Sequence, residues 1–322
     1  MKNNRKKQHP TASSLQQFAN EEIKRLRTVG KIGTANNYAT VIRSFHNWTT
    51  VRSEASNIDG IMMAGYAAYL SDNRGLCRNS VSFHMRILRA ILTKLEKATG
   101  NTPSSDTFQN VYTGIDRTRS KAIDASVVNA LRHLDIPQDR ATMNLARDTF
   151  LLTYYTRGMA FIDAAHLRPD DISDGGTILS YVRQKTGQRL YIAIEPCLKH
   201  IIEKYVRHDR QRYILPWLNN ISEDENTSSH YSAYKTAINT YNRNLHYLSR
   251  LLKANGTNAH LTSYVSRHSW ATAARKHNIP LCVISAALGH MSEKTTEIYL
   301  ASIENPLIDE ANKLIINALE KY

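Results

Sequence analysis

Residues 267–300 read RHSWATAARKHNIPLCVISAALGHMSEKTTEIYL and place three chemically useful side chains in a short length of chain. Arg267 opens an amphipathic helical segment, the tripeptide LGH that ends at His290 closes the next one, and Tyr299 follows nine residues later. An arginine can stabilise charge on phosphodiester oxygens, an imidazole can transfer a proton or donate a hydrogen bond, and a phenol can act as the nucleophile. Any one of the 17 tyrosines, or a histidine at a helix end, would more often be structural; the three together favour phosphodiester cleavage.

This stretch resembles the C-terminal active-site box of the tyrosine recombinases, the phage integrase family. The resemblance implies that Tyr299 attacks DNA to form a 3′-phosphotyrosine and a free 5′-hydroxyl, which conserves the phosphodiester energy without ATP. It also implies that Arg267 contacts the scissile phosphate and that His290 is catalytic. The forms TRGMAFID and SYVSRHSWA are similar to a subgroup found in Bacteroidetes and their mobile elements, either site-specific integrases or DNA invertases.

Two further catalytic positions follow from the resemblance. The family's box usually reads H-x-x-R-H, and this chain has Tyr264 where the first histidine would stand. The hydrogen-bonding task there falls to Tyr264, to His268, or to nothing. Lys185 lies in VRQKTGQR, at the tip of a predicted β-hairpin. The family's catalytic lysine occupies such a hairpin and protonates the leaving 5′-oxygen, whereas an ordinary surface lysine is the structural alternative.

The first catalytic arginine of the family has no direct counterpart. Its box reads roughly G-L-R-x-x-E, and the alignment with TRGMAFID places Ala160 at the arginine and Asp163 at the acid. Arg157 lies three residues upstream. Three helical residues span about 4.5 Å and nearly one turn, so both positions would share one helix face. We therefore assign Arg157 as the first arginine and Asp163 as a carboxylate that orients an arginine.

Composition bounds the class of protein. The 322 residues are enough for two domains, and 42% hydrophobic residues with no apolar run near 18 residues predict a non-membrane protein. The N-terminal MKNNRKKQHPTASS lacks the apolar core of a secretory signal, so we expect a cytoplasmic, nucleoid-associated bacterial protein. Cys77, Cys197 and Cys282 are far apart without a CxxC pair, so neither a disulfide framework nor a metal site is expected. The chain has no P-loop and no carboxylate cluster suited to Mg²⁺, so no cofactor is expected.

Charge points to a polyanionic partner. The net charge is +14, and residues 1–100 hold sixteen Lys and Arg against six Asp and Glu. Such asymmetry favours nucleic acid, while a surface charged only for solubility is the alternative. The candidate DNA-binding residues are cations of the N-terminal region and of the hairpin: Lys31, Arg78, Arg86, Arg89, Arg183 and Arg189.

The hydrophobic pattern predicts a mainly α chain with two domains. Residues 1–11 are expected to be a disordered basic arm, residues 12–100 show four short amphipathic helices, and residues 101–118 are turn-rich and predict a linker. Residues 119–322 are expected to be a mixed α/β, mostly helical domain with a small β-sheet. Its main predicted elements are a helix from about Ala125, helices at 140–155 and 230–253, and a hairpin turning at Thr186-Gly187. The resemblance implies a SAM-like core-binding four-helix bundle followed by a tyrosine-recombinase catalytic domain.

The resemblance implies an enzyme for site-specific DNA recombination, meaning integration, excision or inversion through a Holliday junction. The implied partners are double-stranded DNA at a specific site and a homotetramer on that DNA, with accessory DNA-bending proteins left open. One alternative is a decayed scaffold that binds DNA as a regulator, marked by Ala160 and Tyr264. Another is a type IB topoisomerase-like relaxing enzyme. Residues 304–322 carry an apolar helical stripe that would pack on a neighbouring protomer in a recombinase, or else on the same domain.

Overall fold

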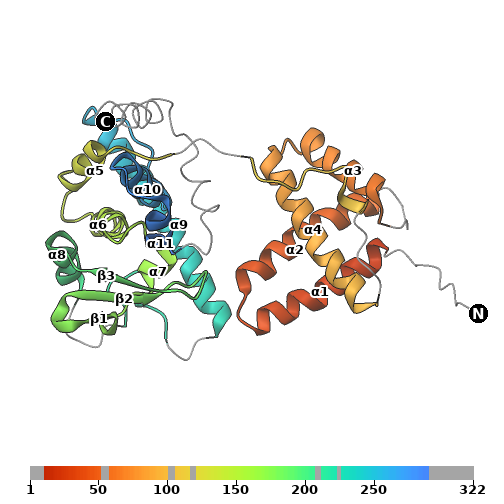
Figure 1. Cartoon of the computed structure of the whole chain (residues 1–322), viewed down its shortest axis with the longest axis horizontal. Helices are drawn as coiled ribbons and strands as arrows, with labels where there is room; N and C mark the ends of the chain where they lie inside the picture. Colours follow the sequence, from red (N-terminus) through yellow and green to blue (C-terminus); the bar gives the residue numbers. More distant parts are fainter. Residues whose placement is uncertain are drawn as a thin grey trace, which may run out of the picture. The chain divides into compact units, whose positions relative to one another are not determined.

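The computed structural model describes residues 11–51, 58–100, 106–116, 121–206, 212–222 and 226–289. It divides the chain into two units, residues 1–116 and residues 117–322, each with its own hydrophobic core (Figure 1). Among these described residues, no helix is long and apolar enough to span a membrane.

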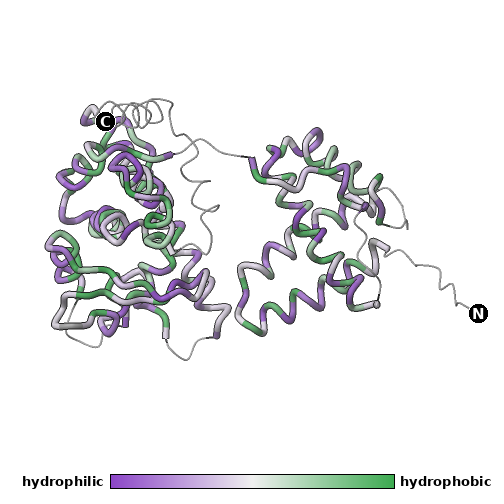
Figure 2. The backbone as a smooth tube through the Cα atoms, viewed as in Figure 1, coloured by the Kyte–Doolittle hydropathy of each residue, from purple (hydrophilic) through white to green (hydrophobic). Residues whose placement is uncertain are grey.

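The described part of the first unit contains four α-helices, the number that the sequence pattern predicts. They are α1 (Ala12–Thr28), α2 (Ile32–Val51), α3 (Gly60–Ala68) and α4 (Arg78–Ala98). Apolar residues recur at helical spacing, and Figure 2 shows hydrophobic and hydrophilic residues alternating along the helices. The rings of Phe45, Trp48 and Tyr66 pack together in the core. The expectation of short helices is wrong for α2 and α4, which have 20 and 21 residues, because their apolar stripes continue over about four turns or more.

The first unit also includes residues that the sequence assigned to the linker. Phe108 and Val111 join its hydrophobic core. The Asn79 side chain exchanges two hydrogen bonds with the Asp116 backbone, at 2.7 and 3.0 Å. The predicted linker at 101–118 is therefore wrong for residues 106–116. Turn-forming residues do indicate a loop there. The side chains of Phe108 and Val111 and the hydrogen bonds between Asn79 and Asp116 hold that loop on the helices.

The second unit is mostly helical with one small antiparallel sheet, which confirms the predicted fold class. Its described helices are α5 (Ala125–Arg132), α6 (Ala141–Tyr155), α7 (Phe161–Ala165), α8 (Pro196–Tyr205), α9 (Thr227–Ala254), α10 (Val265–Lys276) and α11 (Leu281–Ala287). Its strands are β1 (Ile172–Ser173), β2 (Ile178–Val182) and β3 (Arg189–Ala193), in the order β1-β2-β3. Helix α6 packs against α5, α8, α9 and α10, so it lies at the centre of the unit (Figure 1). The helices predicted at 140–155 and 230–253 correspond to α6 and α9.

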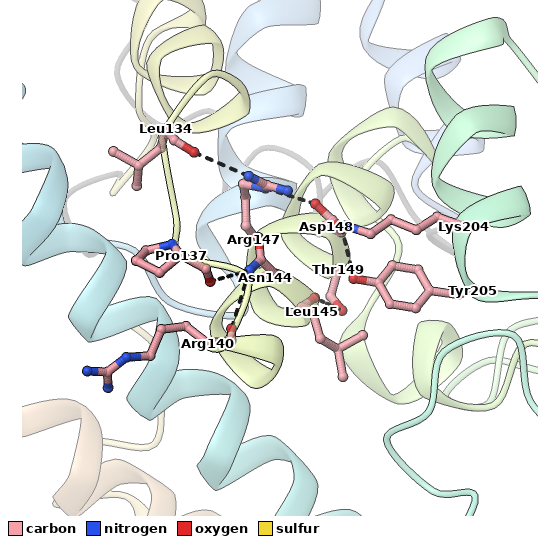
Figure 3. Close-up of polar contacts among 10 residues, drawn as sticks. All are labelled: Leu134, Pro137, Arg140, Asn144, Leu145, Arg147, Asp148, Thr149, Lys204 and Tyr205. Atoms are coloured by element: carbon pink, nitrogen blue, oxygen red, sulfur yellow. Dashed lines mark hydrogen bonds and ion pairs between the residues drawn. The ribbon is translucent and has the colours of Figure 1, made fainter.

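A buried carboxylate ties α6 to α8 (Figure 3). Asp148 accepts hydrogen bonds from Lys204 at 2.6 Å, from the Tyr205 hydroxyl at 2.8 Å and from Arg147 at 2.9 Å. Burial alone would raise the pKa of Asp148, but these donors outweigh burial and lower it. We call Arg147, Asp148, Lys204 and Tyr205 the Asp148 cluster. It joins the two helices, because one carboxylate on α6 accepts hydrogen bonds from two side chains of α8.

Candidate active site

Arg267 connects three segments of the candidate site. It lies on α10 with 4% of its surface exposed. Its Nη1 donates to the carbonyl oxygen of Gly158 at 2.7 Å, and its Nη2 donates to that of Leu288 at 2.6 Å. Gly158 directly follows Arg157, and Leu288 lies two residues before His290 in the sequence. One guanidinium therefore joins α10 to the segments beside two other predicted catalytic residues.

Arg157 lies in a turn between α6 and α7. The backbone φ of Arg157 is 61° and that of Gly158 is 73°, both in the left-handed region. The assumption that Arg157 and Ala160 share one helix face is therefore wrong, because α6 ends at Tyr155 and Ala160 precedes the first residue of α7. A Cβ on Gly158 would lie 2.7 Å from the Cα of Arg267, so the close approach of α10 requires glycine there.

Asp163 lies on α7 beneath the hairpin. It is 4% exposed, and its Oδ1 accepts a hydrogen bond from the backbone N–H of Gln184 at 2.9 Å. Among the described residues, Oδ2 has no hydrogen-bond partner. Burial raises the pKa of Asp163, while the Gln184 amide and the nearby cations Arg183 and Arg267 partly offset the rise. The hydrogen bond of this carboxylate goes to the hairpin backbone, whereas we expected it to orient an arginine.

The hairpin carries Lys185 between β2 and β3. Arg183 and Gln188 close the loop with a backbone hydrogen bond of 2.8 Å, and Gly187 turns it with a φ of 71°. The predicted turn at Thr186-Gly187 is thus confirmed. The Lys185 side chain is exposed at this turn.

Arg183 is buried, whereas we expected it on the DNA-facing surface. It is 6% exposed, and its Nη1 donates to the carbonyl oxygen of Gly289 at 2.5 Å. The sequence contained a signal for this burial. Leu179, Tyr181 and Arg183 alternate along the strand direction, so all three share the inward face of the sheet.

The hydroxyl of Tyr181 lies near the charged side chains of Asp163, Arg183 and Arg267. Burial raises the pKa of its hydroxyl, and the carboxylate of Asp163 raises it further. The cations of Arg267, Arg183 and Arg157 act in the opposite direction. We call Asp163, Tyr181, Arg183 and Arg267 the arginine centre. Tyr181 was not among the residues predicted from the sequence. Its alternation with Leu179 and Arg183 along the strand was the signal that could have placed it on the inward face.

Tyr264 and His268 lie on one side of α10, and two other predicted residues lie outside the described chain. Tyr264 is 50% exposed and precedes the first residue of α10, and the centre of its ring lies 6.3 Å from that of His268. Burial lowers the pKa of His268, and the cations of Arg267 and Lys121 lower it further, which favours a neutral imidazole. His290, Tyr299 and the tail at 304–322 fall outside the described residues.

The predicted DNA-binding arginines of α4 contact their own unit. The guanidinium of Arg78 lies 3.8 Å above the ring of Tyr112, and Arg89 donates to the hydroxyl of Thr113 at 3.1 Å. Arg86 is half-buried, whereas Lys31 is exposed. In the second unit, Arg189 is exposed and donates to the Ser180 hydroxyl at 3.2 Å. Their contacts with DNA remain predictions.

Family models match both units. The phage integrase SAM-like domain matches residues 14–98, and the phage integrase family matches residues 121–305, more than half of the chain. The chain belongs to the phage integrase family. The family resemblance seen in the C-terminal motif is thereby confirmed and extends over both units.

Individual relatives are distant. The chain is 26% identical to tyrosine recombinase XerC of Rickettsia canadensis over 175 residues, which cover 54% of this chain and 52% of the relative. It spans about half the length of the curated relatives it matches, 52% and 48%. The Tn1549 transposon integrase in complex with transposon right end DNA has a TM-score of 0.61 at 11% identity, covering 94% of this chain and 98% of that one. A lambda integrase dimer bound to a COC′ core site has a TM-score of 0.58 at 16% identity, covering 88% and 94%. These two structures share the fold.

Proposed function

We propose that this chain is a tyrosine site-specific recombinase that breaks and rejoins double-stranded DNA. The observation that carries the proposal is the arginine centre. Arg267 is joined to the turn of Arg157 and to the residues just before His290, and the Lys185 hairpin is held on the same centre. Segments more than a hundred residues apart thus carry the predicted catalytic cations beside one buried centre. Membership of the phage integrase family supports the same chemistry.

In the proposed reaction, each residue has one task. The Tyr299 hydroxyl releases its proton to solvent as its oxygen bonds to phosphorus, the bond from phosphorus to the 5′-oxygen breaks, and Lys185 gives that oxygen a proton. Arg267 and Arg157 stabilise the charge that develops on the non-bridging oxygens. Arg267 suits this role because its guanidinium is fixed by two carbonyl groups, so little reorganisation is needed during reaction. His290 supplies a proton or a hydrogen bond to the same phosphate, and Tyr264 adds a hydrogen bond.

The proposed partner is double-stranded DNA at a specific site, bound by a homotetramer that exchanges strands through a Holliday junction. The excess of positive charge in the first hundred residues supports a DNA partner. The related lambda integrase is a dimer bound to its core site, and the Tn1549 integrase is bound to transposon DNA. Integration, excision and inversion share this chemistry, and accessory DNA-bending proteins would act on the same complex.

Covalent trapping tests the proposal. Wild-type protein would be incubated with fragmented genomic DNA of its source organism, the reaction would be stopped with SDS, and the DNA that stays attached to protein would be sequenced to reveal the cleavage site. A nicked synthetic duplex of that site should then accumulate a phosphotyrosyl adduct. Tyr299→Phe should abolish the adduct and retain DNA binding in a gel-shift assay, because only the nucleophilic hydroxyl is removed.

Two results would contradict the assignment. An adduct formed by Tyr299→Phe would place the nucleophile elsewhere. Specific DNA binding by wild type without any adduct would favour a DNA-binding regulator on this scaffold. The variants Arg267→Ala and Lys185→Ala provide the comparison, because both should bind DNA and cleave it slowly.

A further inference from the structure

We propose that Arg183 is a positioning residue that holds the Lys185 hairpin against the C-terminal end of α11 and thereby against Arg267. The inference rests on the proposed function, since it assigns Lys185 its place in the reaction. It gives Arg183 a task inside the protein in place of a contact with DNA.

The first support is the direct link between the hairpin and the end of α11. Arg183 is nine-tenths buried, and its Nη1 donates to the Gly289 carbonyl at 2.5 Å. Gly289 has a φ of 63°, and a Cβ there would lie 3.1 Å from the Leu190 side chain and 3.2 Å from that of Arg183. The hairpin and the end of α11 are therefore packed too closely to move independently.

The second support is that two arginines bind consecutive carbonyl groups. Arg267 donates to Leu288 and Arg183 donates to Gly289, the next residue. Hydrogen bonds from a charged guanidinium are stronger than neutral ones, and the planar group fixes direction as well as distance. This pair of bonds connects Lys185, through Arg183, Gly289 and Leu288, to the guanidinium of Arg267.

The third support is the anchoring of the loop on both sides of Arg183. Its own backbone N–H donates to Gln188 at 2.8 Å, and its carbonyl accepts from Gly187 at 2.8 Å. The next residue, Gln184, donates its N–H to the buried carboxylate of Asp163. Lys185 follows at once, with an exposed side chain. The base of the loop is thus fixed while the ammonium group remains free to reach the 5′-oxygen.

Arg189 offers a matched control in the same hairpin. It pairs with Val182 in the β2–β3 register and carries the same charge, but it is exposed and donates only to Ser180 within the sheet among the bonds described. Replacing either arginine by methionine removes one positive charge and keeps a long apolar stem. A general loss of charge would affect both variants, whereas loss of the link to Gly289 affects only Arg183→Met.

Hydrogen exchange tests the link without DNA. Arg183→Met should speed amide exchange in two peptides, one covering the hairpin at 182–190 and one covering α11 at 281–289, because their shared anchor is lost. Arg189→Met should leave the α11 peptide unchanged. Unchanged exchange of the α11 peptide in folded Arg183→Met would overturn the proposal, whether or not the wild-type protein cleaves DNA.

Cleavage chemistry tests the role. With the duplex recovered by covalent trapping, Arg183→Met should lose on the order of 10²-fold in single-turnover cleavage, as a misplacement of about 1 Å can cause. DNA binding should stay within about twofold. A substrate with a 5′-bridging sulfur releases a thiolate, which needs no proton, so it should restore cleavage by Arg183→Met as it does by Lys185→Ala. For the cleavage assay the charge control is Lys199→Met on α8, where the ammonium pairs only with Glu203 at 3.8 Å among the ion pairs described, and this variant should cleave both substrates at near wild-type rates.

A double variant tests whether Arg183 acts through Lys185. If Arg183 acts through Lys185, then Arg183→Met combined with Lys185→Ala should cleave no more slowly than Lys185→Ala alone. Additive losses, absence of rescue by the sulfur substrate, or weaker DNA binding at an unchanged cleavage rate would each overturn the proposal. If thermal melting shows that Arg183→Met does not fold, Arg183→Lys enters the same assays with the same expected directions, because one ammonium cannot reproduce the planar donor. Absence of cleavage by wild type would instead contradict the proposed function.

Discussion

Two buried aspartates in the second unit have the same exposure and opposite surroundings. Asp148 on α6 and Asp163 on α7 are each 4% exposed. Asp148 accepts hydrogen bonds from three side chains, whereas Asp163 accepts one from a backbone amide and, within the described residues, leaves its second oxygen without a partner. Burial alone would raise the pKa of Asp148, but its hydrogen bonds outweigh that effect and lower the pKa. Burial raises the pKa of Asp163, and the nearby amide and cations offset only part of the rise.

The difference separates a cluster that joins two helices from the centre that lies beside the predicted catalytic residues. Removing a buried carboxylate that has all of its donors in place destabilises the folded state, because its partners lose their acceptor. A buried carboxylate with incomplete partners costs stability, and such groups concentrate at functional sites. The Asp148 cluster joins two helices, while the arginine centre joins the segments that carry the predicted catalytic residues.

The largest expected difference is in stability. Asp148→Ala should lower the free energy of unfolding by about 2–3 kcal/mol, less than a fully buried pair would lose because Lys204 is partly exposed. Asp163→Asn should change it by less than about 1 kcal/mol, because it replaces an incompletely paired buried charge by a neutral group. Urea denaturation of both variants measures the two values. Equal losses would remove the distinction between the two aspartates.

A smaller effect is expected from a methyl group in the arginine centre. Gly158→Ala adds a Cβ at 2.7 Å from the Arg267 Cα, so it should cost about 2 kcal/mol of stability and reduce DNA cleavage. Gly256→Ala is the control, since Gly256 also has a positive φ, of 80°, but open space around its Cα. Only the backbone strain, about 1 kcal/mol, should appear there. Thermal melting of the two variants measures the difference, and similar losses would show that the contact with Arg267 yields easily.

The smallest effect is the pH dependence of each aspartate. The lowered pKa of Asp148 means that its stabilisation is complete above the pKa of an unfolded aspartate, about 3.9, and is lost as pH falls through the lower folded value. The raised pKa of Asp163 means that its penalty is complete above the folded value and disappears as pH falls to about 3.9. Unfolding free energies of wild type, Asp148→Asn and Asp163→Asn between about pH 3 and 7 should therefore diverge in opposite directions. Parallel curves would mean that one of the two environments is misassigned.

Local patterns predicted much of the fold and part of the site. Apolar spacing predicted the four helices of the first unit and also α6 and α9, because amphipathic periodicity reflects burial directly. The pair Thr186-Gly187 predicted the hairpin turn that presents Lys185, since glycine readily adopts the left-handed conformation. The order of residues around Arg267 identified the family that the matches over both units then confirmed.

Local sequence patterns could not predict contacts between segments that are far apart in the chain. The helix face that we expected Arg157 and Ala160 to share is absent, because the chain leaves α6 after Tyr155 and Gly158 approaches an α10 residue more than a hundred positions away. The linker is shorter than its composition indicates, because Phe108 and Val111 find a core built by other helices. Neither partner is visible from the local sequence.

For this protein, the sequence by itself determined the amphipathic helices, the hairpin turn and the excess of positive charge, and it supplied the candidate catalytic residues. Each of these depends on neighbours within a few positions or on composition. Only the tertiary structure decided that Arg183 donates to the Gly289 carbonyl and that Asp163 holds the hairpin through Gln184. These roles depend on which backbone carbonyl or amide lies within about 3 Å of a side chain, and only packing brings residues so far apart in the chain to that distance.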